Sequence, residues 1–427
     1  MIYIFVGIIF LVLSAMKYYV YMRFLRHFSF IHRYICLCFL CLLAIGEILL
    51  FVVRDASFAH WQYLICASCV VLDYALFMAC VCVDIVRLCL SFVQSYRAKK
   101  ARKNTQDSTE NTTSTFISQS SNAKENAYKD STQSISSHTN DSASLVLPST
   151  LSRRSFLHLI TDVAVVILFA IFSIKSFVNA LSIPPVKNVH LRLSNLKGTL
   201  RIAMITDVHI GKTLGREFLE QIVERINALN ADIVVIVGDL VDDKIQYIKD
   251  DLEPLKYLKS AQGVYYVAGN HEYYHGIDPI LKYLSTLNLH ILHNTNIELE
   301  NVNLAGVSDL AGLRFGHIEP DIESAKKDLN PHKPSILLSH QPKFTRLYDV
   351  SDFDVVLCGH THAGQVFPLS FFVWLEQHYV YGLYHLPNTP KPTQLYVSSG
   401  VGFWGPAIRF LAPSEIVCLT LEGDKDS

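Results

Sequence analysis

The segment LRIAMITDVH (residues 200–209) decides the fold, because a run of β-type apolar residues ends there in Asp207 and His209. The segment IVVIVGD (233–239) repeats the pattern and ends in Asp239. Between the two, apolar side chains recur at the spacing of one helix face, at Phe218, Ile222, Ile226 and Leu229. A strand, a helix and a second strand in this order predict an α/β domain, in which the residues that follow the strands meet at one sheet edge.

Three further apolar runs, at 264–267, 335–338 and 355–358, also end in polar residues. The five predicted strands end in the signatures Asp207-Val208-His209, Gly238-Asp239, Gly269-Asn270-His271-Glu272, Ser339-His340 and Gly359-His360-Thr361-His362. These offer carboxylate, amide and imidazole groups, a mixture that suits divalent Mn, Fe, Zn or Co. Asp-x-His and His-x-His place alternate side chains on one face of an extended chain. One signature alone is weak evidence, but five in this order predict a metal centre.

The five signatures together resemble the calcineurin-like metallophosphoesterase superfamily, from about residue 192 onward. The segments LSHQP (338–342), GHTHAGQ (359–365) and SSGVGFWGP (398–406) look like its bacterial membrane-anchored phosphohydrolase branch, although Ala363 stands where glycine is usual. The resemblance implies an α/β fold, a four-layer αββα sandwich, and a hydrolase that acts as a phosphodiesterase or phosphatase.

The resemblance also implies two divalent metal ions, each of them Mn, Fe, Zn or Co. The implied ligands are Asp207, His209 and His362 for the first ion, Asn270, His340 and His360 for the second, and Asp239 as the bridge between them. A hydroxide that bridges the metals would attack the phosphorus atom in line. His271 would face the substrate as a catalytic residue, together with the bridging Asp239.

Two features near the C-terminus extend this prediction to the substrate. Arg409 is predicted to contact the substrate, because a guanidinium matches the geometry of phosphate; a surface arginine is the alternative. The stretch 367–386 is unusually aromatic, with Phe371, Phe372 and Trp374 close behind the last ligand pair. It predicts either core packing or an apolar lip that meets the bilayer or the acyl chain of a lipid substrate.

Residues 1–96 predict a membrane region. They hold three apolar runs, at 2–16, 34–53 and 63–93, each of which can cross a bilayer as a helix, the first only if its flanks contribute. Basic residues gather between the first two runs and after the third, so the positive-inside bias predicts that both connections are cytoplasmic. Glu47 and Asp73 are expected to face other helices, because a charge in hydrocarbon is costly.

Residues 97–152 predict a disordered cytoplasmic linker, since they become rich in Ser, Thr, Asn and Gln and hold few large apolar residues. The segment 153–181 opens with two arginines and is either a fourth transmembrane helix or an internal signal that resembles a twin-arginine signal. Both alternatives place the catalytic domain, 182–427, on the extracytoplasmic side of a bacterial inner or plasma membrane, in a multi-pass protein. Val178-Asn179-Ala180 also resembles a signal-peptidase site, whose cleavage would release the domain.

Composition limits the remaining function classes. The chain has 37 basic and 38 acidic residues, a formal net charge of -1, so nucleic acid is not an expected partner. Most of its 10 cysteines lie in the apolar N-terminal runs, where thiols behave as small hydrophobes. The expected partners are a phosphoester substrate, with lipid phosphoesters as one class, and the membrane bilayer. A nucleotide phosphoesterase and a non-enzymatic metal-binding membrane sensor are the alternatives.

Overall fold

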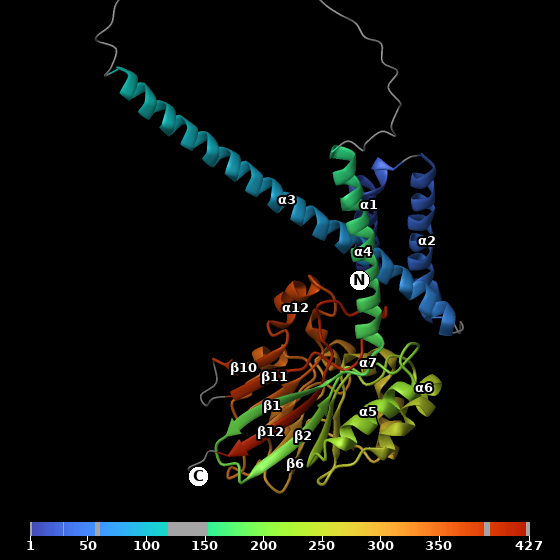
Figure 1. Ribbon diagram of the computed structural model, residues 1–427. Coiled ribbons are helices and arrows are strands. Elements are labelled where there is room, and N and C mark those ends of the chain that lie inside the picture. Colours follow the sequence, from blue (N-terminus) through green and yellow to red (C-terminus); the bar gives the residue numbers. More distant parts are fainter. Residues whose placement is uncertain (1, 29, 56–59, 118–152, 388–392, 424–427) are drawn as a thin grey trace, which may run out of the picture.

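The computed structural model describes residues 2–28, 30–55, 60–117, 153–387 and 393–423. Figure 1 shows a bundle of helices from the N-terminal part of the chain, standing on an α/β domain from the C-terminal part. The bundle consists of α1 (Ile2–Arg23), α2 (Phe30–Asp55), α3 (His60–Ile117) and α4 (Arg153–Leu181), with the short 3-10 helix η1 (Leu25–His27) after α1.

Three segments of the described chain are long and apolar enough to cross a membrane, Phe30–Phe51, His60–Lys100 and Phe156–Leu181. Acidic side chains inside the bundle are paired between helices. The ammonium group of Lys17 on α1 lies 2.6 Å from Glu47 on α2 and 2.9 Å from Asp73 on α3. This confirms the prediction that Glu47 and Asp73 face other helices.

Helix α3 runs to Ile117, so the first part of the predicted linker is helical and the prediction of disorder is wrong there. The physical reason lies at the junction, where Arg97, Lys99 and Lys100 favour helix and an apolar helix that is already formed removes the cost of nucleation. The rest of the predicted linker, 118–152, lies outside the described residues.

The C-terminal domain contains two six-stranded sheets. The first has the order β1 (Val186–Leu193), β12 (Ile416–Gly423), β2 (Thr199–Ile205), β3 (Ile233–Val237), β4 (Val264–Val267) and β5 (His290–Ile291). The second has the order β10 (Gly382–Leu386), β11 (Thr393–Val397), β9 (Val355–Cys358), β8 (Ser335–Leu338), β7 (Asn303–Gly306) and β6 (Thr295–Glu298). Strands β2, β3 and β4 are parallel, as are β7, β8 and β9, so their carboxyl ends lie at common edges.

Helices cover the outer faces of the two sheets. On the first sheet they are α5 (Arg216–Ala228), α6 (Ile245–Leu252), η2 (Glu253–Tyr257), α7 (Asn270–His275), α8 (Ile277–Leu284) and η3 (Ser285–Leu287). Those that follow β7 in the chain are α9 (Ala311–Phe315), α10 (Ile322–Ala325), α11 (Phe344–Leu347), η4 (His362–Gly364) and α12 (Leu369–Gln377). Residues of α10 and α11 pack on the second sheet. The layers therefore run helix, sheet, sheet, helix, and the predicted αββα sandwich is confirmed.

Strand β3 shows why the sheet strands are continuous apolar runs. Val234 and Ile236 pack in the core beneath α5 and α8, whereas Val235 and Val237 pack in the core between the two sheets. A strand that is buried on both faces has no polar face, so the usual alternation disappears.

Helix α4 ends inside the catalytic domain. Ala180 is buried in the same core as Ala203 and Ile205 of β2. Cleavage after Ala180, which the sequence suggested as a way of releasing the domain, would therefore separate Ala180 from the core in which it packs.

Candidate metal centre

Loops at the carboxyl ends of five strands bring the predicted ligands together. Asp207 and His209 follow β2, and their amides donate hydrogen bonds to the carbonyls of Gly238 and Asp239, which follow β3. In the second sheet, the amide of Gly359 after β9 donates to the carbonyl of His340 after β8. Neighbouring parallel strands thus deliver their loops to one place, as expected for this fold class.

The backbone at these ligands is unusual. Asp207, His209, Asp239, His360 and His362 all have φ between 48° and 69°, the left-handed region that non-glycine residues rarely adopt. Such conformations persist where the surroundings impose them, and they cluster at functional sites. Gly359 allows a close approach, because a Cβ atom there would collide with the side chains of Thr206 and Asp207.

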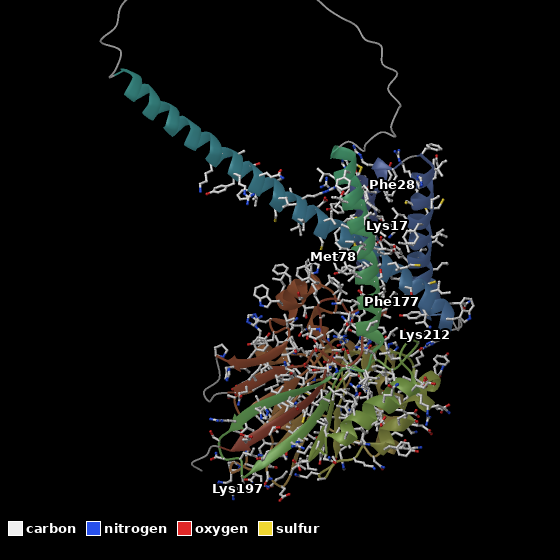
Figure 2. All side chains as sticks on the ribbon, in the orientation of Figure 1. Lys17, Phe28, Met78, Phe177, Lys197 and Lys212 are labelled. Atoms are coloured by element: carbon white, nitrogen blue, oxygen red, sulfur yellow. The ribbon has the colours of Figure 1, made fainter. Side chains whose placement is uncertain are left out.

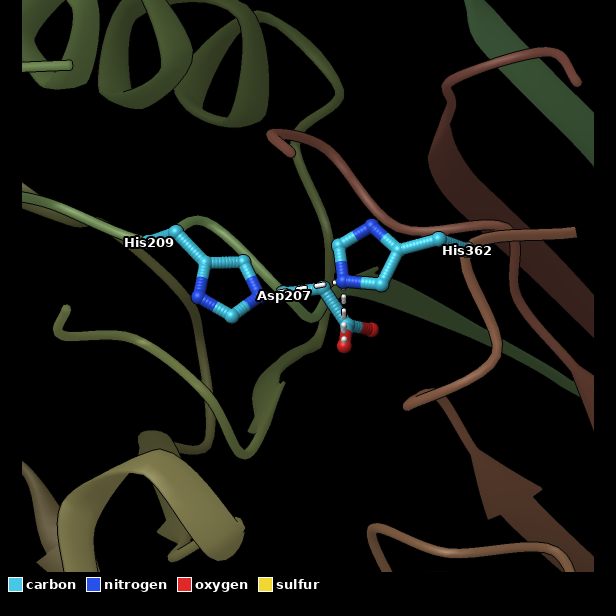
Figure 3. Close-up of side chains that lie close together, drawn as sticks. All are labelled: Asp207, His209 and His362. Atoms are coloured by element: carbon cyan, nitrogen blue, oxygen red, sulfur yellow. Dashed lines mark hydrogen bonds and ion pairs between the residues drawn. The ribbon is translucent and has the colours of Figure 1, made fainter. Parts of the chain in front are cut away.

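The first ligand group is Asp207, His209 and His362, all buried (Figure 3). The Nε2 atoms of His209 and His362 lie 3.0 Å apart, and Nε2 of His362 lies 3.3 Å from Oδ1 of Asp207. The carboxylate of Asp207 is held by Thr206, whose hydroxyl donates to Oδ2 over 2.7 Å, and by the amide of His360. Three ligand atoms within 4.8 Å of one another can share a single ion.

The second ligand group is Asp239, His340 and His360. Oδ2 of Asp239 lies 3.1 Å from Nε2 of His340 and 3.9 Å from Nε2 of His209, so this carboxylate stands between the two groups. Nδ1 of His340 contacts the carbonyl of Val237 at 2.8 Å, which turns Nε2 toward the site. The carboxylate of Asp239 therefore lies within 4 Å of a ligand atom from each group.

The electrostatics of the site suit a divalent ion. Burial lowers the pKa of both His209 and His360 to about 3, so both rings are neutral and keep a lone pair for a metal. Burial alone would raise the pKa of Asp239, but His340 and His271 outweigh it and hold that pKa well below its usual range. Oδ1 of Asn270 is buried and has no hydrogen-bond partner among the described residues, as expected for a ligand atom.

Glu272 supports Asp239 from behind, a role that the sequence did not suggest. It is fully buried, and its carboxylate accepts hydrogen bonds from the amides of Gly269 at 2.7 Å, Leu240 at 2.8 Å and Asp239 at 3.1 Å. Three donors from two loops fix the backbone on either side of the metal centre.

His271 lies beside the ligands and is held by a residue that the sequence reasoning missed. Its Nδ1 lies 2.7 Å from Oδ1 of Asp242, and its Nε2 points into the site, 4.0 Å from Oδ2 of Asp239. His275 lies 3.4 Å from the same atom of Asp242. Burial alone would lower the pKa of His271, but Asp239 and Asp242 outweigh it and raise that pKa to about 9.

Arg409 is not placed where it could contact a substrate. Its side chain is fully buried behind His362, where Nη2 lies 3.0 Å from Nδ1 of that ring. The guanidinium also donates to the carbonyls of Gly402, Ser399 and Pro413. These carbonyls already use the donors that a phosphate would need, so both the predicted phosphate contact and the alternative of a surface arginine are wrong.

The aromatic stretch divides into two parts. Tyr379 and Tyr384 pack against the core outside the second sheet, as core packing predicts. On α12, however, Phe371, Phe372 and Trp374 are 56%, 60% and 46% exposed. Figure 1 shows α12 on the side of the domain that faces α3 and α4.

Several known proteins are similar to this chain in sequence. The family profile for calcineurin-like phosphoesterases matches residues 200–364. An uncharacterized metallophosphoesterase of Campylobacter jejuni is 48% identical over 270 residues, which cover 63% of this chain and 71% of that protein. One from Helicobacter pylori is 49% identical over 249 residues, 58% of this chain and 66% of that protein. A transmembrane protein with a metallophosphoesterase domain from Danio rerio is 34% identical over 275 residues, 61% of this chain and 62% of that protein.

Proposed function

This chain belongs to the calcineurin-like metallophosphoesterase family, and from that premise we propose that its C-terminal domain, 182–427, hydrolyses a phosphoester with two divalent metal ions. The observation that carries the proposal is the shared carboxylate of Asp239, which lies between two groups of ligand atoms. The donors are imidazole nitrogens and carboxylate or amide oxygens, which suits Mn, Fe, Zn or Co.

Each residue of the site has a defined task in this proposal. Asp207, His209 and His362 would hold one ion, Asn270, His340 and His360 would hold the other, and Asp239 would contact both. Bound ions supply Lewis-acid activation of the phosphoryl group and of the attacking water. His271 donates a proton from Nε2 to the leaving oxygen, while Asp242 fixes its Nδ1.

Metal removal tests this function. We expect full-length protein in detergent to hydrolyse an aryl phosphoester, to lose that activity after treatment with a chelator, and to regain it with about two Mn²⁺ per chain. Aryl phosphomonoesters and diesters assayed side by side would separate a phosphatase from a phosphodiesterase. If the protein binds Mn²⁺ but shows no turnover on any phosphoester, the site is that of a sensor.

We also propose that residues 1–96 and 153–181 anchor the domain on the extracytoplasmic side of a bacterial inner or plasma membrane. In Figure 1 the end of α1, the start of α2 and the start of α4 lie at the end of the bundle away from the catalytic domain. Arg23, Arg26 and Arg33 belong to this end, as do Arg153 and Arg154 at the start of α4. The positive-inside bias assigns that end to the cytoplasm.

Protease accessibility tests this topology. We expect a protease added to spheroplasts to digest the catalytic domain, and protection until the membrane is broken would contradict the assignment. Changing Arg153→Lys together with Arg154→Lys keeps the charge but removes a twin-arginine signal. A domain that the protease no longer reaches in this variant identifies an export signal, whereas unchanged digestion identifies α4 as an ordinary span.

A lipid phosphoester is the substrate class that the surface near the site supports best. The exposed side chains of α12, Phe371, Phe372 and Trp374, form an apolar lip that begins a few residues after the ligand His362. Val366, which lies between His362 and this lip in the sequence, belongs to one hydrophobic cluster with Val71 and Met78 of the membrane helix α3. Amphipathic aromatics favour the membrane interface, so this lip can meet the bilayer close to the metal centre.

Substitution of the lip tests this part of the proposal. We expect Phe371→Ser with Trp374→Ser to weaken turnover of a lipid phosphoester in vesicles by about tenfold or more, because each buried aromatic contributes about 1.5–3 kcal/mol. Hydrolysis of a soluble aryl ester should not change. Tyr247→Ser with Tyr257→Ser, at exposed positions on α6 and η2, is the matched control. Equal losses on both substrates would point to a packing role for α12.

A further inference from the structure

A short segment, Ile408-Arg409-Phe410, lies between the membrane helices and the metal centre; we name it the 408–410 strap. Its last residue is paired with the loop that follows His362. The amide of Phe410 donates to the carbonyl of Gln365 over 3.0 Å, and the amide of Phe367 donates to the carbonyl of Phe410 over 3.1 Å. The strap is therefore joined to the chain that carries a predicted ligand.

The membrane helices hold one side of this strap. The backbone amide of Arg409 donates to the carbonyl of Ser176 on α4 over 3.3 Å, and the side-chain Nδ2 of Asn179 donates to the carbonyl of Arg409 over 3.4 Å. The ring of Phe410 lies 4.8 Å from the ring of Phe172 on α4 and 5.8 Å from that of Tyr74 on α3.

Side chains of both helices complete this contact. The hydroxyl of Tyr74 donates a hydrogen bond to the carbonyl of Phe367. Met78 of α3 packs in one cluster with Ile408 and Phe410, and Phe177 of α4 packs against that cluster. Figure 2 shows Met78 and Phe177 at the junction between the helices and the catalytic domain.

The side chain of Arg409 holds the other side. Its Nη2 contacts Nδ1 of His362 at 3.0 Å and the carbonyl of Ser399 at 2.8 Å, and its Nε donates to the carbonyl of Gly402 over 2.9 Å. Nη1 of Arg409 also donates to the backbone carbonyl of His362 over 3.4 Å. Arg409 thus acts on His362 by fixing the backbone that carries the ring and the loops around it.

We propose that α3 and α4 position the ligand His362 through the 408–410 strap, so that the membrane helices set the metal affinity of the group Asp207, His209 and His362. The inference rests on the proposed function, because it assumes that this group binds an ion. In the other group only His360 shares the loop of His362, whereas Asp239 and His340 lie in the loops after β3 and β8, which the strap does not include. The two metal positions should therefore respond differently to a change in the helices.

A single substitution within the membrane helix tests this without altering the catalytic domain or the charge of Arg409. In Phe172→Ala the strap loses its ring contact, and we expect Mn²⁺ to bind one of its two positions about tenfold more weakly, as is usual when the support of a ligand is lost. Phe169→Ala on the same helix is the matched control, since Phe169 packs within the bundle and not against the strap. Equilibrium binding of Mn²⁺ to the full chain measures the affinity of both positions. Electron paramagnetic resonance distinguishes a coupled pair of Mn²⁺ ions from an isolated ion.

The expected result is an isolated Mn²⁺ signal in Phe172→Ala at concentrations where wild type and Phe169→Ala show the coupled pair. Tyr74→Phe, which removes only the hydroxyl bond to Phe367, should shift binding in the same direction by less. The inference would be overturned if Phe172→Ala and Tyr74→Phe left the Mn²⁺ affinity of both positions unchanged, or if they weakened the two positions equally. Wild type that binds fewer than two Mn²⁺ would instead overturn the proposed function.

Discussion

Asp239→Asn is expected to abolish phosphoester hydrolysis and to lower the metal content of the protein. Asp239 is 2% exposed, and its Oδ2 atom lies between the two ligand groups, 3.1 Å from His340 and 3.9 Å from His209. An amide of the same size keeps the packing but lacks the negative charge that offsets two adjacent cations. We expect kcat to fall by at least about 10³-fold, as for the loss of a central electrostatic group.

Metal analysis together with kinetics on an aryl phosphoester measures both effects. Asp232→Asn is the matched control, because Asp232 lies just before the amino end of the same strand, β3, where its Oδ2 accepts a hydrogen bond from the amide of Arg201. The control should keep two metals and near-normal turnover. An Asp239→Asn protein with two metals and full activity would show that the bridge is assigned to the wrong residue.

The ligand positions could be predicted from the sequence because the strands that carry them are buried on both faces. Such strands are read as continuous apolar runs, and the structure places β3, β4, β8 and β9 at the predicted residues, 233–237, 264–267, 335–338 and 355–358. In a parallel sheet the residues after these runs meet at one edge. Their left-handed backbone, by contrast, is imposed by tertiary contacts that no single segment encodes.

The roles of two residues near the site, Asp242 and Arg409, were not predicted correctly from the sequence. Asp242 stands three positions after Asp239, and that spacing was the available signal, but its contact with His271 joins two different loops. Arg409 was predicted to face the substrate because a guanidinium matches phosphate. The same planar group of donors also matches clustered backbone carbonyls, and the packing of the 408–410 strap decided between the two.

His271→Ala is expected to keep both metals and to lose rate. Nε2 of His271 lies 4.0 Å from the carboxylate of Asp239, at the edge of the ligand groups, and Asp242 holds Nδ1 at 2.7 Å. A proton donor of this kind contributes about 10²–10⁴-fold to the rate. The loss should be largest for an alkyl leaving group, which needs a proton, and much smaller for a nitrophenyl leaving group, which departs as a stable anion.

Asp242→Asn should follow the same pattern with a smaller loss, because the ring of His271 remains but its orientation is no longer fixed. Rates for the two leaving groups, together with metal content, separate the possible roles: equal losses would indicate an electrostatic contact with the phosphoryl group, and loss of metal would make His271 a ligand.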